Sequence, residues 1–168
     1  MNITHVASMK SKTSFARSAE AYARVAIALA DAFIACWDEK YRSLLIRPET
    51  YINLYIDEDW VPLLQTPPFP EYVSGHSMIS GSASIALTKI FGDNFSFTDS
   101  TEIEFGISSR SFNSFNQAAD EAAVSRLYGG IHYRRANEIG LSMGRKIGSF
   151  VNERLITRKE VLTSARQQ

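Results

Sequence analysis

Three short segments place cations and histidines next to positions where helices are expected to begin or end. The segments read Lys40-x6-Arg47-Pro48, Ser74-Gly75-His76 and Ser125-Arg126-x5-His132. Together they supply three cations, one hydroxyl, one main-chain N–H at a helix N-terminus and two imidazoles. This set of groups is suited to binding a tetrahedral oxyanion.

Each group has a definite use around such an anion. Arg47 and Arg126 can bind its oxygens bidentately, and Lys40 can neutralise them as a point charge. Gly75 lets the main chain come close, and the helix N-terminus adds the positive end of its dipole. One histidine can then attack or ligate the central atom while the other exchanges a proton.

Simpler interpretations compete for the same residues. A lone histidine is more often structural, and Lys40 could carry its amine from an apolar surface to solvent. The occurrence of His76 and His132 inside two of the three segments described above favours the oxyanion site. Tyr72, beside the second segment, is a further candidate, whereas the acidic run 57–59 is interpreted as a solvated turn.

Other classes of site are disfavoured by composition and spacing. The single cysteine, Cys36, excludes an internal disulfide and a cysteine-based metal site. The histidines lack the compact spacing of zinc ligands. Residues 72–76 do not fit the G-x-S-x-G pattern of a serine hydrolase.

The composition is that of an ordinary globular protein. The chain has 168 residues, 45% of them hydrophobic, and its length favours a single domain over 1–168. Eighteen Lys and Arg balance 18 Asp and Glu, which argues against nucleic acid or an anionic membrane as a partner. The start lacks the apolar core of a signal peptide and no apolar run reaches membrane-spanning length, so we expect a cytoplasmic protein.

Apolar spacing predicts helices over about 13–41, 74–91, 114–128 and 134–158, and hence an all-α architecture. In the first helix, Phe15, Val25, Phe33 and Cys36 share one face. Lys40 lies four residues after Cys36 and belongs to the same face. A lysine buried there needs an anionic partner.

The segments between these helices are predicted as loops. Pro48 pushes Arg47 out of the α region, and residues 48–72 are expected to form a long loop with one helical turn around 57–64. The phenylalanines of residues 91–115 either pack the second loop, 93–112, onto the bundle or line a substrate entrance. Ser114-x-x-Gln117 predicts a capping box. The glycines at 140, 144 and 148 recur every four residues and predict tight helix packing rather than a phosphate loop.

The three segments, in this order on a helical chain, resemble the signature of the type 2 phosphatidic acid phosphatase (PAP2) and vanadium-dependent haloperoxidase superfamily. The gaps between them are 25 and 48 residues, and the resemblance covers about 36–150. The flanking sequences PPFPEY and YGGIHYR are more similar to the bacterial haloperoxidase-like branch than to membrane lipid phosphatases. The resemblance implies a helical bundle of the PAP2/haloperoxidase type.

The resemblance also implies a role for each residue. The oxygens of phosphate or vanadate would be held by Lys40, Arg47, Ser74, Gly75 and Arg126. His76 would be the acid–base residue, which protonates a leaving group or handles the protons of peroxide. His132 would be the nucleophile of a phosphatase or the axial ligand to the vanadium of vanadate.

The chain departs from the family pattern in three respects. Val73 occupies the position of a proline, and Ala136 occupies that of an aspartate that would orient His132. Asn137 or Glu138 could substitute, although on a helix each points away from position 136. The chain also lacks upstream helices of the haloperoxidase branch, which suggests a fragment, a reduced bundle, or a homo-oligomer in which a partner supplies the missing wall.

We therefore expect an enzyme that binds vanadate and oxidises halide with hydrogen peroxide. The alternative is a soluble acid phosphatase that hydrolyses a phosphoester through a phosphohistidine and needs no cofactor. A third hypothesis, from a different class, is a non-catalytic remnant that binds an oxyanion or serves as an assembly subunit. In each case the expected ligands are small molecules.

Overall fold

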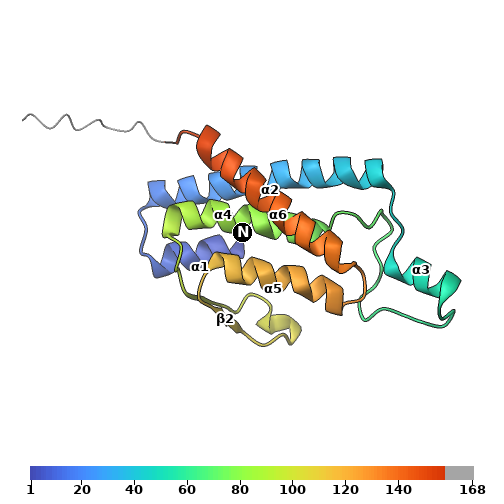
Figure 1. Cartoon of the computed structure of the whole chain (residues 1–168). Coiled ribbons are helices and arrows are strands. Elements are labelled where there is room, and N and C mark those ends of the chain that lie inside the picture. Colours follow the sequence, from blue (N-terminus) through green and yellow to red (C-terminus); the bar gives the residue numbers. More distant parts are fainter. Residues whose placement is uncertain (158–168) are drawn as a thin grey trace, which may run out of the picture.

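The computed structural model describes residues 1–157 and shows a bundle of helices (Figure 1). The elements are α1 (Asn2–Lys10), α2 (Phe15–Ser43), α3 (Pro48–Tyr55), α4 (Gly75–Phe91), β1 (Phe97–Asp99), the 3-10 turn η1 (Ile103–Phe105), β2 (Arg110–Phe112), α5 (Phe115–Tyr128) and α6 (Arg134–Arg154). Helix α4 packs against α2, α5 and α6. The predicted all-α helical bundle is confirmed.

Serine side chains begin the helices where the sequence predicted. The Ser74 hydroxyl accepts a hydrogen bond from the main chain of Ser77 at the start of α4. The Ser114 hydroxyl accepts from the main chain of Gln117 at the start of α5, as a capping box requires. The Gln117 side chain reaches back to the N–H of Asn113, one residue further than in the usual box.

The prediction for residues 48–72 was partly wrong, because this segment contains α3. Pro48 stands in the first turn of α3, where a missing N–H costs nothing and the fixed φ favours the helix. Arg47 is extended, with φ −72° and ψ 154°, as the proline predicted. Residues 57–64 contain a single hydrogen-bonded turn, in which the N–H of Trp60 donates to the carbonyl of Asp57, and no helix. Pro48 was predicted only to end a helix, whereas in the structure it begins one.

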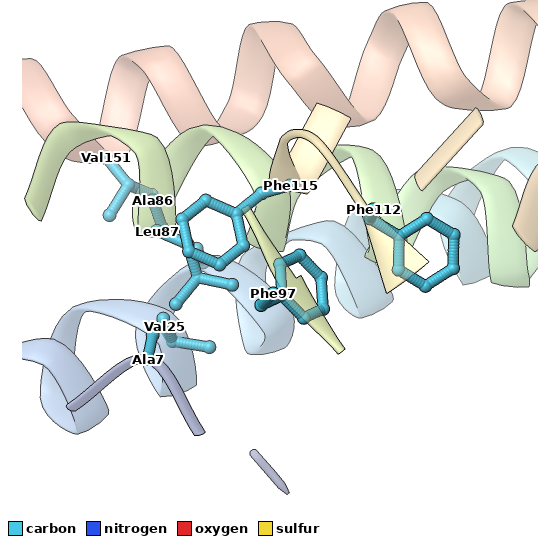
Figure 2. Packing of buried hydrophobic residues seen from close by; sticks show 9 residues of the cluster. Ala7, Val25, Ala86, Leu87, Phe97, Phe112, Phe115 and Val151 are labelled. Carbon is cyan, nitrogen blue, oxygen red and sulfur yellow. The ribbon is translucent and has the colours of Figure 1, made fainter. Parts of the chain in front are cut away.

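A short hairpin and helix α1 were also missed. Strands β1 and β2 pair antiparallel, with Phe97 opposite Phe112. These two rings and Phe115 join a buried cluster that includes Ala7 of α1 and Val25 of α2 (Figure 2). Most phenylalanines of the 93–112 segment therefore pack it onto the bundle, whereas Phe105 is exposed.

The buried face of α2 differs from the predicted one. Phe15 is 89% exposed and Phe33 is 44% exposed, so their assignment to the core was wrong. The buried stripe follows the small residues of the helix, namely Ala21, Val25, Ala28, Ala32 and Cys36. Small side chains let α4 approach closely, and the large aromatic rings lie at the edges of this contact. Lys40 continues the stripe and is fully buried, as predicted.

Helices α4 and α6 meet through the glycines of α6. A Cβ atom on Gly140 would lie 2.9 Å from the carbonyl oxygen of Ser74, and one on Gly148 would lie 2.6 Å from that of Ser82. A Cβ on Gly144 would overlap the carbonyl of Met78. The predicted tight packing is confirmed. Helix α6 ends at Arg154, before the predicted end at Arg158, which lies outside the described residues.

Much of the apolar surface of α2 and of the segment after it faces outward. The most exposed apolar residues there are Phe15, Ile34, Tyr41, Leu44, Leu54, Tyr55, Ile56, Val61 and Leu63. Within residues 1–157, no helix is both long and apolar enough to cross a membrane.

The glycine contact predicts a large effect for Gly144→Ala. The added methyl group would overlap main-chain atoms of α4, which cannot move aside like a side chain. Overpacking costs about 1–3 kcal/mol, so we expect the free energy of unfolding in urea to fall by about 2 kcal/mol despite the better helix propensity of alanine. Ser142→Ala, at an exposed position of α6, is the control. Equal stability of the two variants would contradict the close contact.

Candidate oxyanion site

The three segments that the sequence analysis singled out converge at one end of the bundle. Lys40 lies near the end of α2, Ser74 to His76 begin α4, and His132 immediately precedes α6. A pocket of about 280 Å³ opens between them. It is lined by Trp37, Pro67, Phe69, Gly75, His76, Ile79, Ser80, Ile131 and His132.

Lys40 is held beneath this pocket by main-chain oxygens. Its Nζ donates to the carbonyls of Pro70 and Glu71 at 2.8 and 2.9 Å, and it lies 5.3 Å from the centre of the Phe69 ring. Burial lowers the pKa of Lys40 to about 8. The predicted anionic partner is thus replaced, within the described residues, by two carbonyl dipoles. Carbonyl oxygens carry no net charge, and the nearby carboxylate of Glu71 stabilises the charged amine only in part.

Arg47, the second cation, contacts His132 directly. Its Nη1 lies 3.1 Å from Nε2 of His132 and donates to the carbonyl of Ile131 at 2.8 Å. Its Nε donates to the carbonyl of Phe69 at 3.0 Å. Both side chains are buried. Burial lowers the pKa of His132, and the hydrogen bond to Glu71 opposes this shift only in part. His132 is therefore a neutral imidazole at neutral pH.

Glu71 is a residue of the site that the sequence analysis missed. Its Oε1 lies 2.6 Å from Nδ1 of His132 and accepts the main-chain N–H of Tyr133 at 3.1 Å. Asn137 and Glu138, which the sequence offered as substitutes for the absent aspartate, do not contact His132. The Asn137 amide oxygen accepts a hydrogen bond from the Ser77 hydroxyl, and Glu138 is exposed. The signal that could have found Glu71 is its position three residues before Ser74, on the chain leading into α4.

Ser74 and Gly75 form the first turn of α4 at the pocket. The main-chain N–H of Ser74 donates to the carbonyl of Ala136 at 3.1 Å, so this amide is already used. The Ser74 hydroxyl accepts from Ser77 Oγ at 2.9 Å. A Cβ on Gly75 would lie 3.5 Å from the Trp37 ring, at ordinary contact distance. Gly75 thus places the end of the helix, with its unsatisfied N–H groups, directly against the pocket wall.

His76 and Arg126 lie on the outer side of the site. Part of the His76 side chain reaches solvent, while burial and then the charges of Arg126, His132 and Lys40 lower its pKa. Arg126 donates from Nε to the Ser125 hydroxyl at 3.1 Å, and no hydrogen bond of its terminal nitrogens is found within residues 1–157. His76 is therefore neutral at neutral pH and can accept a proton, and Arg126 can still bind an anion.

The assembled groups suit an oxyanion and not a metal cation. Gly75, His76 and His132 line the pocket, and the charges of Lys40, Arg47 and Arg126 lie near enough to lower the pKa of one or both histidines. Ser74 adjoins Gly75, and Tyr72 and Cys36 pack in the apolar cluster beside them. In the described part of the chain, no group of three or more His, Cys, Asp or Glu side chains could hold a metal ion. Positive charges, helix N–H groups and one unprotonated imidazole nitrogen are what a tetrahedral anion with an electrophilic centre requires.

The lowered pKa of Lys40 predicts a pH dependence for anion binding. Below about pH 8 the amine is charged and attracts an anion, and above it the amine is neutral. The affinity for molybdate, whose own charge is constant at neutral and alkaline pH, should therefore fall towards about tenfold per pH unit above pH 8. Calorimetry on the wild type and on Lys40→Met checks this. A constant affinity, or the same fall in Lys40→Met, would contradict the assignment.

Comparison with known proteins shows which family the chain matches. The family described as "VCPO second helical-bundle domain" matches residues 20–158. The solved structure of "the first bacterial vanadium dependant iodoperoxidase" is similar to this chain with 60% identity and a TM-score of 0.90, over 92% of this chain and 38% of that one. A comparison with curated proteins gives no match.

More distant structures share the fold. A holo-type bacterial vanadium-dependent chloroperoxidase has 22% identity and a TM-score of 0.67, over 77% of this chain and 34% of that chain. The apo-type structure of a bacterial vanadium-dependent chloroperoxidase has 22% identity and a TM-score of 0.61, over 73% of this chain and 33% of that chain. The chain thus spans less than two fifths of the length of each of these three structures. Because the family match extends over most of the sequence, the chain belongs to the family of the VCPO second helical-bundle domain, as the resemblance to haloperoxidases predicted.

Proposed function

We propose that this chain carries the vanadate site of a vanadium-dependent haloperoxidase, which oxidises halide with hydrogen peroxide. The observation that carries the proposal is the position of His132, which lines the pocket together with His76 and whose Nε2 lies 3.1 Å from the Arg47 guanidinium. Iodide is the first halide to test, because the similar structure with 60% identity is an iodoperoxidase.

The chemistry of the donor set fits vanadate. Lys40, Arg47 and Arg126 supply the charge that its oxygens need, and Ser74 and Gly75 add the hydroxyl and helix N–H groups. His132 would hold the vanadium through Nε2, its unprotonated nitrogen. When bound, vanadate supplies a Lewis-acidic centre that activates hydrogen peroxide for transfer of oxygen to halide.

His76 is placed to move protons for this reaction. Its lowered pKa keeps the imidazole neutral at neutral pH, so that a ring nitrogen can take a proton from hydrogen peroxide as it binds. The same nitrogen can return the proton when product leaves. The side chain lines the pocket together with His132 but reaches solvent, which allows exchange with bulk water.

The walls around the two histidines are apolar. Trp37 and Phe69 lie 5.2 Å apart, centre to centre, and line the pocket with Ile79 and Ile131. Such walls exclude water and strengthen the electrostatic attraction between the cations and an anion. Among halides, polarisable iodide is the one that an apolar wall accommodates most readily.

A phosphatase remains the second candidate because the same groups fit phosphate. A phosphohistidine at His132 requires a carboxylate that stabilises the charged imidazole. Ala136 cannot supply it, but Glu71 lies 2.6 Å from Nδ1 and can. The two activities therefore have to be separated by experiment.

The activity test uses the purified protein with iodide or bromide and hydrogen peroxide, before and after loading with vanadate. We expect halide oxidation that depends on vanadate, is suppressed by phosphate, and is abolished in His132→Ala. His5→Ala, which changes an exposed histidine of α1, is the matched control and should keep full activity.

The other outcomes are equally informative. Hydrolysis of a phosphomonoester such as p-nitrophenyl phosphate, lost in His132→Ala and without halide oxidation, would replace the proposal with the phosphatase. Tight vanadate binding without either activity would indicate a non-catalytic binder. Retention of halide oxidation in His132→Ala would exclude the proposed role of this residue.

We further propose that copies of this chain associate in solution. The support is the exposed apolar surface of α2 and α3, where Ile34 and Leu54 are 67% and 65% exposed. Contiguous exposed apolar surface commonly marks a contact with another protein. Light scattering after size-exclusion chromatography should give a mass above that of one chain, and a stable monomer at high concentration would contradict association.

A further inference from the structure

Glu71 is a buried carboxylate that lies against His132 and close to the charges of Lys40 and Arg47. Its side chain is 1% exposed, and the His132 side chain beside it is 3% exposed. Burial of a carboxylate is costly unless hydrogen bonds compensate for the lost water. Among the described residues, Oε1 has two donors, whereas Oε2 is buried without a partner. The hydrogen bonds that Oε1 accepts from His132 and from the main-chain N–H of Tyr133 therefore hold the Glu71 side chain in place.

The hydrogen bonds around His132 determine which ring nitrogen carries the proton. An arginine side chain can only donate hydrogen bonds. The contact at 3.1 Å between Arg47 Nη1 and Nε2 therefore makes Nε2 the acceptor. In a neutral imidazole the proton is then on Nδ1, from which it is donated to Oε1 of Glu71. The lone pair of Nε2 faces the cations.

We propose that Glu71 is the positioning residue of His132 and takes over the task of the aspartate that Ala136 replaces. It fixes the Nδ1-protonated tautomer and the direction of the ring, so that Nε2 can ligate the central atom of an oxyanion. The importance of this tautomer for vanadate rests on the proposed function. The tautomer itself does not depend on it.

Position 136 is buried in the contact between the beginnings of α4 and α6. Ala136 is 1% exposed, and its carbonyl accepts the Ser74 N–H that joins the beginnings of α4 and α6. Glu71 approaches His132 instead from the chain that precedes α4. A carboxylate on that chain orients the histidine without entering the contact between the two helices.

Glu71 also links the histidine to the cations. Its main-chain carbonyl accepts Lys40 Nζ at 2.9 Å, and the neighbouring carbonyl of Pro70 accepts from Lys40 at 2.8 Å and from Arg47 at 3.4 Å. One short segment of chain thus sets the position of the lysine, of one arginine and of the imidazole. Loss of the Glu71 side chain should disturb the histidine first, because the contacts of the cations use main-chain atoms.

The test measures the tautomer of His132 by nitrogen NMR of the histidine side chains in the full chain, without vanadate. We expect Nδ1–H in the wild type. Glu71→Gln keeps an oxygen that can accept this proton and should preserve the tautomer. Glu71→Met has a similar volume but leaves the buried Nδ1–H without an acceptor. This is costly, so the ring should turn away from Arg47 in part of the molecules and give a mixture of tautomers. The signals of His132 are identified by their loss in His132→Ala.

The second readout is the affinity for orthovanadate in equilibrium dialysis. Loss of a residue that orients a ligand typically weakens binding by about 10- to 100-fold, which we expect for Glu71→Met. Glu71→Gln should retain most of the affinity. Glu138→Gln, an exposed carboxylate of α6, is the control and should bind as the wild type does.

The outcomes separate this inference from the proposed function. Nε2–H in the wild type would overturn the inference without any variant, even if Glu71→Met did not fold. A Glu71→Met protein with an unchanged tautomer or unchanged vanadate affinity would also overturn it. If the wild type binds no vanadate, the proposed function is wrong, and the tautomers of the wild type and Glu71→Met still decide whether Glu71 positions His132.

Discussion

The contact between the main chains of α4 and α6 is the interaction on which the site depends. Ser74 N–H donates to the Ala136 carbonyl at 3.1 Å. Further along, the glycines of α6 lack side chains that would keep the main chains of α4 and α6 apart. His76 follows Ser74 by two residues, and His132 precedes Ala136 by four. The distance between the two histidines is therefore set by main-chain packing, which is stiffer than any contact between long side chains.

The cations are arranged so that their charge stays available. Lys40 and Arg47 donate to carbonyl oxygens of residues 69–71 and 131, which satisfy their N–H groups without adding negative charge. In residues 1–157 neither they nor Arg126 forms a salt bridge, and the carboxylate of Glu71 is occupied by His132. The energy that burial of these cations costs is thus offset by dipoles. An anion is the partner that can neutralise them fully.

The sequence predicted which residues meet, but not everything that positions them. Ordered motifs and caps were enough for Ser74, Ser114 and the glycines of α6, because each acts through local geometry. Glu71 could not be found in this way, since it lies in a proline-rich segment without periodicity and meets His132 across 61 residues. Phe33 was wrongly assigned to the core because apolar spacing takes no account of side-chain size. The close packing of α2 against α4 buries small residues and leaves this large ring partly exposed.

The proposed site needs only part of the length of the similar structures. The chain matches 38% of the similar iodoperoxidase chain, yet the groups proposed to hold the oxyanion all come from residues 40–132. What this part of the fold leaves open is the outer side, where His76 reaches solvent and Phe33 stacks on Trp37 at 4.0 Å while remaining 44% exposed. In the proposed function, binding of the anion would depend on charges and an imidazole that are buried within the bundle. Exclusion of water and choice of halide would depend on the apolar rim, where an additional wall from another protein surface would have its largest effect.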